Sequence, residues 1–376
     1  IVKKIERFEA DYQTPSKEGF EHFMLKEIYE QPKTIQNAMF GRSSPNFEKF
    51  GFSESEIKSF KNVWILGCGT SAHAGSIGAM YFEDLAKLPA SCDIASEARY
   101  RDPILGPDTL VIGISQSGET ADTLAAIREA KKQGCKILGI CNVLHSTLSR
   151  EATGSIFLKA GPEISVCSTK AFSSQLVILN LLALHFAHVR GCLAPEKADT
   201  YLAELKKIPE QIQEVIQQAP LLQKLAKKYA SYHDFFFMGR RYMFRAAQEA
   251  ALKLKEISYV NANGYPAGEL KHGPLALVNP QLPIVAFCSN SKTQEKILSN
   301  LMEVKARGGP ILAFAPKEMK EVAAVADDVI WLPSTLDELA PFASTIAGQL
   351  LAYFIAKEKG CDIDQPRNLA KSVTVE

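Results

Sequence analysis

The stretch Val111-Ile-Gly-Ile-Ser-Gln-Ser-Gly-Glu-Thr120 contains the change of pattern that decides the fold. It begins in an apolar segment, Leu110 to Ile114, which predicts a short buried strand. Hydroxyls, an amide and a glycine follow, and then a helical pattern runs from Ala121 to Lys132. A turn that leads from a strand into a helix lies beside unpaired backbone N–H groups at the positive end of the helix dipole. We therefore expect this turn to bind an anion.

Four side chains of this turn can donate hydrogen bonds to a phosphate group: Ser115, Gln116, Ser117 and Thr120. The alternative is that Ser117 and Thr120 only cap the helix, as hydroxyl side chains often do. The turn by itself does not separate these two interpretations.

The strand–turn–helix pattern occurs twice in the 376 residues, a length that suits two domains. Strands alternate with helices in both halves, which predicts an α/β fold with parallel, doubly wound sheets. The segment 234–239 resembles 63–67, and 283–291 resembles 110–117, so we infer an internal duplication.

The second copy of the turn differs from the first. It keeps Ser289-Asn-Ser291 but has Lys292 where the first copy has Gly118, which predicts one strong anion turn and one degenerate turn. The predicted organisation has five parts: a helical lead-in (1–60), a first domain (61–196), a helical connector (197–232), a second domain (233–359) and a C-terminal tail (360–376).

Composition excludes several classes of function. The 43 basic and 42 acidic residues leave a net charge of +1, which favours neither nucleic acid nor an anionic membrane as partner. The longest apolar run, near 176–189, is interrupted by polar residues and predicts a buried helix. The eight cysteines lack metal-site or disulfide spacing, so we expect reduced thiols, no metal and a cytoplasmic protein.

A second turn, Gly67-Cys-Gly-Thr-Ser-Ala72, fits a loose dinucleotide pattern, and Asp93 lies where a ribose-binding acid could be. However, the hydroxyls of Thr70 and Ser71 are more typical of a site for a small polar ligand. Both turns belong to the carboxyl edge of one predicted sheet, where ligands bind. A sugar phosphate is therefore favoured over a dinucleotide.

Two segments of the second copy carry ionisable groups. On the helix 246–257, Lys253 and Glu256 share a face, and a partly buried Glu256 could act as a base. The alternative for Lys253 is a surface ion pair with Glu249. The loop 264–274 presents His272 between glycines and prolines, although it could equally be a solvated loop.

Several of these residues belong to motifs that resemble the glucosamine-6-phosphate synthase family, in its C-terminal isomerase part with two sugar isomerase (SIS) domains in tandem. The resemblance covers essentially the whole chain. The motifs are Cys68-Gly-Thr-Ser71, Ser115-Gln-Ser-Gly-Glu-Thr120, Ser168-Thr-Lys-Ala-Phe172, Ala251-Leu-Lys-Leu-Lys-Glu-Ile-Ser258, Gly268-Glu-Leu-Lys-His-Gly-Pro274 and Pro366-Arg-Asn-Leu-Ala-Lys-Ser-Val-Thr-Val-Glu376.

The resemblance implies two sets of binding residues. The phosphate of fructose 6-phosphate would be bound by Ser115, Gln116, Ser117 and Thr120. The sugar or its phosphate would be contacted by Thr70, Ser71 and Ser168.

The resemblance also implies catalytic roles, with no cofactor. His272 would open the sugar ring, reaching in from the neighbouring subunit of a homodimer. Glu256 would move a proton between C1 and C2, and Lys253 and Lys371 would assist at the reacting carbons. The tail would close over the site.

The family makes glucosamine 6-phosphate with ammonia that an N-terminal glutaminase domain releases from glutamine. Residues 1–60 are too few for such a domain, so we expect this chain alone to isomerise fructose 6-phosphate to glucose 6-phosphate and to aminate it only with supplied ammonia. The alternative is a non-catalytic SIS module that senses sugar phosphates, but the sequence contains no helix-turn-helix or basic surface.

Overall fold

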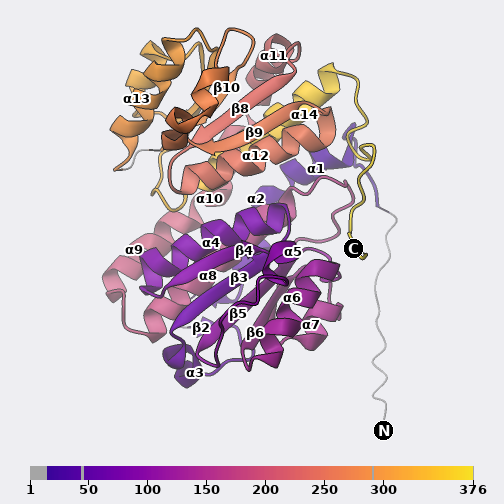
Figure 1. Ribbon diagram of the computed structural model, residues 1–376, viewed down its shortest axis with the longest axis vertical. Coiled ribbons are helices and arrows are strands. Elements are labelled where there is room, and N and C mark those ends of the chain that lie inside the picture. Colours follow the sequence, from indigo (N-terminus) through magenta and orange to yellow (C-terminus); the bar gives the residue numbers. More distant parts are fainter. Residues whose placement is uncertain (1–14, 44–45, 290–291, 376) are drawn as a thin grey trace.

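The structure is a computed structural model that describes residues 15–43, 46–289 and 292–375 (Figure 1). It contains two five-stranded sheets whose neighbouring strands are all parallel, in the orders β4-β3-β5-β6-β7 and β9-β8-β10-β11-β12. The expected α/β fold with two tandem, doubly wound parallel sheets is therefore confirmed. The first sheet consists of β3 (Asn62–Gly67), β4 (Ala90–Ile94), β5 (Thr109–Ser115), β6 (Lys136–Cys141) and β7 (Gly154–Phe157). The second consists of β8 (Asp234–Gly239), β9 (Asn261–Pro266), β10 (Ile284–Phe287), β11 (Ile311–Pro316) and β12 (Asp328–Leu332).

Helices cover both faces of each sheet. The helices between the sheets contribute to one continuous apolar core: α4 (Thr70–Ala86), α8 (Lys170–Val189), α12 (Tyr242–Ser258) and α14 (Ala340–Glu358). Smaller apolar clusters lie under the outer elements, which include α5 (Ala95–Ala98), α6 (Ala121–Lys132), α7 (Thr147–Glu151) and α13 (Gln294–Lys305). Figure 1 shows the two sheets one above the other, with α4 and α12 facing each other between them. The shared core therefore fixes the orientation of the two domains, so that the carboxyl ends of the first domain's strands lie toward the second domain.

Helix α8 is long and apolar enough to cross a membrane by length and composition. However, 94% of that window is buried inside the chain, as in the core helix of a folded domain. Three helices connect the two sheets: α9 (Pro195–Lys206), α10 (Ile208–Ile216) and α11 (Ala219–Tyr229).

The two copies have closely matching backbones. Helices α4 and α12 both have 17 residues, and the residues before them share an unusual conformation, with φ 51° and ψ −124° at Gly69 and φ 49° and ψ −124° at Arg241. Both helices end at a residue in the left-handed region, Lys87 and Tyr259. Such agreement at irregular positions supports the internal duplication.

Strand register corrects the alignment of the two turns by one residue. Val111 lies opposite Trp64 in the first sheet. In the second sheet, Ile284 lies opposite Phe236, the residue of β8 that corresponds to Trp64, so Ile284 corresponds to Val111. Cys288 therefore takes the place of Ser115, four residues further along the chain. Gly118 then corresponds to position 291, not to Lys292. Asn290 and Ser291, which belong to the expected degenerate turn, lie outside the described residues.

The lead-in contains α1 (Phe23–Tyr29), α2 (Gln31–Met39), the β1–β2 pair (Arg42–Ser43 and Asn46–Phe47) and α3 (Glu54–Ser59). Helices α2 and α3 pack on α8 of the first domain, and α1 packs on α14 of the second. Helix α1 buries the carboxylate of Glu27, whose Oε1 accepts hydrogen bonds from the backbone N–H groups of Ile164 (2.5 Å) and Ser165 (3.2 Å). Burial and the nearby carboxylate of Glu163 raise the pKa of Glu27 to about 8. Through these hydrogen bonds the lead-in holds the loop that precedes α8 in place. The arrangement requires a carboxyl group to be buried.

We expect Glu27→Gln to stabilise the protein at alkaline pH. The folded chain holds a proton on Glu27 that the unfolded chain releases between pH 4.5 and about 8, so stability falls as pH rises through this window. Glutamine keeps the Oε1 acceptor but cannot ionise. Urea unfolding should show a gain of roughly 3–5 kcal/mol at pH 8.5 and almost none near pH 4.5. The surface variant Glu204→Gln is the control, and an equal effect of Glu27→Gln at both pH values would contradict the prediction.

Candidate functional site

The Ser115–Thr120 turn follows β5 at the carboxyl edge of the first sheet. The Ser115 hydroxyl lies 2.7 Å from that of Thr120 and accepts a hydrogen bond from the Gly118 N–H. Gly118 has φ 69°, and a Cβ on it would lie 2.2 Å from Ser146 Oγ, so only glycine fits. Helix α6 has no side-chain cap, which argues against the alternative that Ser117 and Thr120 serve only as caps.

The C-terminal tail lies directly on this turn. The Ser372 and Ser117 hydroxyls are 3.1 Å apart, and the Ala121 N–H at the start of α6 donates to the Val373 carbonyl (3.2 Å). The tail therefore contacts the hydroxyl and backbone N–H groups of the turn that the sequence predicts to bind a phosphate.

A fully buried ammonium group, that of Lys253, connects the two domains. Its Nζ donates to Thr70 Oγ1 (2.8 Å) and to the Ser168 carbonyl (3.1 Å) of the first domain. On its own helix it pairs with Glu249 Oε1 (3.2 Å) and Glu256 Oε2 (2.9 Å). The Glu249–Lys253 pair is thus present, but both side chains are 0% exposed, so the alternative of an ordinary surface ion pair is wrong.

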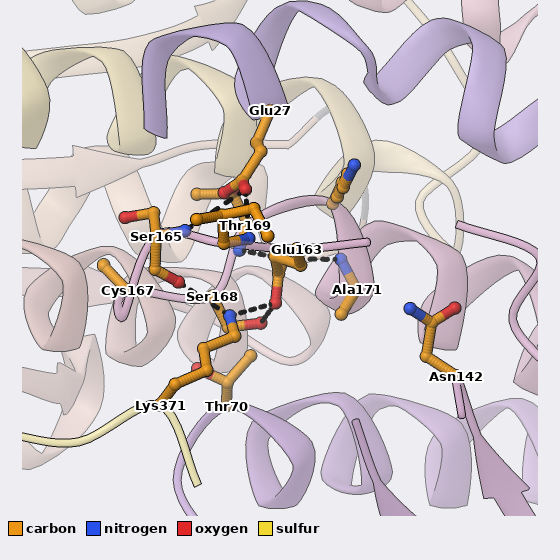
Figure 2. Close-up of polar contacts among 12 residues, drawn as sticks. Glu27, Thr70, Asn142, Glu163, Ser165, Cys167, Ser168, Thr169, Ala171 and Lys371 are labelled. Carbon is orange, nitrogen blue, oxygen red and sulfur yellow. Dashed lines mark hydrogen bonds and ion pairs between the residues drawn. The ribbon is translucent and has the colours of Figure 1, made fainter. Parts of the chain in front are cut away.

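The tail contributes a second lysine, Lys371, to the same region (Figure 2). Its Nζ donates to Glu163 Oε2 (2.6 Å) and to the Ser165 carbonyl (2.8 Å). Glu163 also accepts from the Ser168 hydroxyl (3.0 Å) and from the backbone N–H groups of Thr169 and Ala171 (2.9 and 3.0 Å). Burial opposes the charge of Glu163, but Lys371 and these donors hold its pKa below the usual value.

One oxygen of Glu256 is anchored by two hydrogen-bond donors. Its Oε2 accepts from Lys253 and from the Cys167 thiol, each at 2.9 Å. Burial, followed by the charge of Glu256, raises the pKa of Cys167 well above its usual range, so the thiol stays protonated and is the donor. The Glu256 side chain is 22% exposed. No hydrogen bond is recorded for its Oε1 among the described residues, which leaves this oxygen available to a ligand.

The remaining candidates differ in their placement. Ser71 is buried and accepts a hydrogen bond from Gln175 (3.1 Å). Gln116 contributes its carbonyl to the Asn142 N–H (2.9 Å), and its side chain is partly exposed. His272 is exposed at the end of η1 (Ala267–His272), and no contact joins it to Glu256 within the described part of this chain. Asp93 Oδ2 accepts hydrogen bonds from the Trp64 indole (2.7 Å) and from Arg101 (2.6 Å).

Sequence reasoning missed three residues that organise the site: Glu163, Cys167 and Ser372. The proximity of Ser372 to Lys371 was the only available signal. Glu163 and Cys167 contact Lys371 and Glu256, which are far away in the sequence.

Sequence reasoning considered Glu249 only as an ion-pair partner of Lys253. In the structure Glu249 also accepts from Thr70 (3.0 Å) and contacts His73 Nδ1 (2.7 Å), and His73 lines a cleft of about 290 Å³.

Comparison with known proteins agrees with this arrangement. The model of the SIS domain family matches residues 56–185 and 228–356. The glutamine–fructose-6-phosphate aminotransferases (isomerizing) of Methanosarcina mazei and Thermus thermophilus are 48% and 47% identical to this chain over 100% and 99% of its length. The chain spans 61% and 62% of the lengths of these relatives.

Solved structures give the same result. The C-terminal domain of glucosamine-fructose-6-phosphate aminotransferase from Francisella tularensis has a TM-score of 0.90 and 42% identity, covering 94% of this chain and 100% of that one. A glucosamine-6-phosphate deaminase from Thermotoga maritima, with a TM-score of 0.74 and 24% identity over 94% of this chain and 99% of its own, shares the fold. The chain therefore belongs to the SIS domain family, with two SIS domains in tandem that match the C-terminal part of the glutamine–fructose-6-phosphate aminotransferases.

Proposed function

We propose that this chain binds fructose 6-phosphate at the Ser115–Thr120 turn and moves a proton between C1 and C2 of the open-chain sugar. The observation that carries the proposal is the position of Glu256. Its Oε2 is held by Lys253, a residue that is itself bonded to Thr70 and Ser168 at the strand ends of the first domain. A carboxylate fixed in this way, with its other oxygen available, has the geometry of a general base.

Phosphate binding would anchor the substrate away from the reacting carbons. The hydroxyls of Ser115, Ser117 and Thr120 and the amide of Gln116 would donate to the phosphate, with the N-terminus of α6 adding a favourable dipole. Thr70, Ser71 and Ser168 would then contact the sugar. Binding at the phosphate fixes the orientation of the chain, so that C1 and C2 lie beside Glu256.

Glu256 would remove the proton from C1 and return it to C2. With the ketone at C2, this shift passes through an enediol and gives glucose 6-phosphate. With ammonia, loss of water forms an imine at C2, and the same shift gives glucosamine 6-phosphate. Lys253 and Lys371 would stabilise negative charge that develops on the oxygens at C1 and C2.

His272 would open the sugar ring from a neighbouring subunit. Support comes from its exposed position at the end of η1, where a neighbouring subunit could be reached. A homodimer would supply it across a two-fold interface.

The ammonia would come from a glutaminase domain, as the names of the relatives, glutamine–fructose-6-phosphate aminotransferase, suggest. The product would enter amino sugar biosynthesis. We further propose a cytoplasmic location, which suits a chain whose eight cysteines are all free.

We expect Glu256→Gln to abolish turnover while preserving binding. The amide keeps an oxygen for Lys253 and Cys167 but cannot accept the C1 proton. Conversion of fructose 6-phosphate to glucose 6-phosphate, measured in a coupled assay, should fall by about 10²–10⁴-fold. The dissociation constant, measured by calorimetry, should change by less than about threefold, because phosphate contacts supply uniform binding.

The surface variant Glu204→Gln serves as the control for Glu256→Gln. Unchanged turnover in Glu256→Gln would remove Glu256 as the base. A wild-type chain that binds fructose 6-phosphate but does not convert it would instead favour a sugar-phosphate-sensing module.

We expect two inactive variants to complement each other if His272 acts across a dimer. His272→Ala and Glu256→Gln chains are unfolded, mixed in equal amounts and refolded together. Each mixed dimer then contains one site with both residues intact, so about a quarter of wild-type activity should return. Failure of a verified mixed dimer to regain activity would show that His272 acts within its own chain or not at all.

A further inference from the structure

The duplicated fold contains a second site that corresponds residue by residue to the first. In α4, Asp84 occupies the helix position that Glu256 holds in α12, and Tyr81 occupies that of Lys253. Asp337 precedes α14 by the same number of residues as Cys167 precedes α8. The second domain presents its own strand ends to α4, just as the first presents its strand ends to α12.

The contacts of the two sites match as well. In the first, Lys253 bonds to Thr70 at the start of α4 and to the Ser168 carbonyl. In the second, Tyr81 stacks on Tyr242 at the start of α12, with ring centroids 5.4 Å apart, and donates to the Glu338 carbonyl (2.8 Å). Glu338 corresponds to Ser168, so the architecture is conserved while its chemistry has changed.

The second turn already holds an anion that belongs to the chain. Asp337 Oδ1 accepts from the hydroxyl of Ser289, which takes the place of Gln116 in the register of the strands (2.8 Å). Cys288 stands where the first copy has the Ser115 hydroxyl. The cavity left beside Cys288 and Ser289 measures about 10 Å³, room for one water molecule at most.

Arg241 neutralises this anion and reaches across to the first domain. Its guanidinium donates to Asp337 (2.8 Å) and to Asp84 of α4 (2.6 Å), and Asp84 also accepts from the Tyr242 hydroxyl (2.6 Å). Arg241 has φ 49° where the first copy has Gly69, a conformation that a residue with a side chain adopts only under strain. The two ion pairs of Arg241 therefore lie on a strained backbone position that glycine would adopt without strain.

We propose that Asp337 closes the second site to sugar phosphates and that Arg241 is a positioning residue, which clamps α4 to the second domain. The clamp fixes the orientation in which α12 lies across the first domain's strand ends. It therefore sets the distance between Glu256 and the phosphate turn, and this consequence rests on the function proposed above.

The test compares Arg241→Met, Arg241→Lys and Arg241→Gly, with Arg128→Met as the control for loss of a surface ion pair with Glu151. In Arg241→Met, kcat for fructose 6-phosphate isomerisation should fall at least about tenfold, and KM should change less than about threefold, because the phosphate turn is untouched. Lysine should restore kcat to within about threefold of wild type. Glycine relieves the backbone strain at this position, so we expect Arg241→Gly to fold. If Arg241→Met does not fold, the kcat of Arg241→Gly tests the clamp.

Calorimetric titration gives a second, independent readout. Fructose 6-phosphate should bind to one site per chain, in the wild type and in Arg241→Met. Two sites per chain, or an unchanged kcat in both Arg241→Met and Arg241→Gly, would overturn the proposal. A wild-type chain that binds one equivalent without turnover would instead contradict the proposed isomerase function and leave the closed second site supported.

Discussion

The buried ammonium group of Lys253 constrains the whole arrangement of the site. A charge removed from water costs several kcal/mol unless it is paired and hydrogen-bonded. Burial opposes the charge on Lys253, but the carboxylates of Glu249 and Glu256 hold its pKa well above the usual value. Its acceptors come from α12, from the start of α4 and from the loop before α8. All three segments must therefore stay together for the charge to be tolerated, and this requirement fixes α12 over the first sheet.

Much of the architecture could be predicted from local sequence. Buried parallel strands such as β5 are continuous apolar runs, and the glycines and hydroxyls that follow them identify the turns at the carboxyl edge. The duplication could be recognised because both halves contain the same strand, turn and helix patterns in the same order. The turn Ser115–Thr120 lies where the pattern predicts, and Thr70, Ser168, Lys253, Glu256 and Lys371 lie together in the structure.

What the sequence could not show are pairings between residues that are far apart in the chain. In the sequence, Glu163 is a single acidic residue in a predicted loop, with no sign that it forms an ion pair with Lys371 of the tail. Lys253 fits a surface ion pair by helix spacing, because spacing alone says nothing of what covers that face. The correspondence between the two turns also depends on hydrogen bonds between strands. An alignment of the two halves by sequence can therefore be shifted by one residue and still agree with the local strand, turn and helix patterns.

The two copies show how one backbone supports different chemistry. Gly69 and Arg241 share the same dihedral angles, but only the glycine adopts them without a cost of about 1–3 kcal/mol. The first copy receives Lys253 and Glu256 from the other domain, and its turn is contacted by the C-terminal tail. The second copy places its own arginine and aspartate in the corresponding space, and this arginine also pairs with Asp84 of the first domain. Under the proposed function, each chain would therefore have one catalytic site, because Asp337 and Arg241 occupy the corresponding position of the second copy.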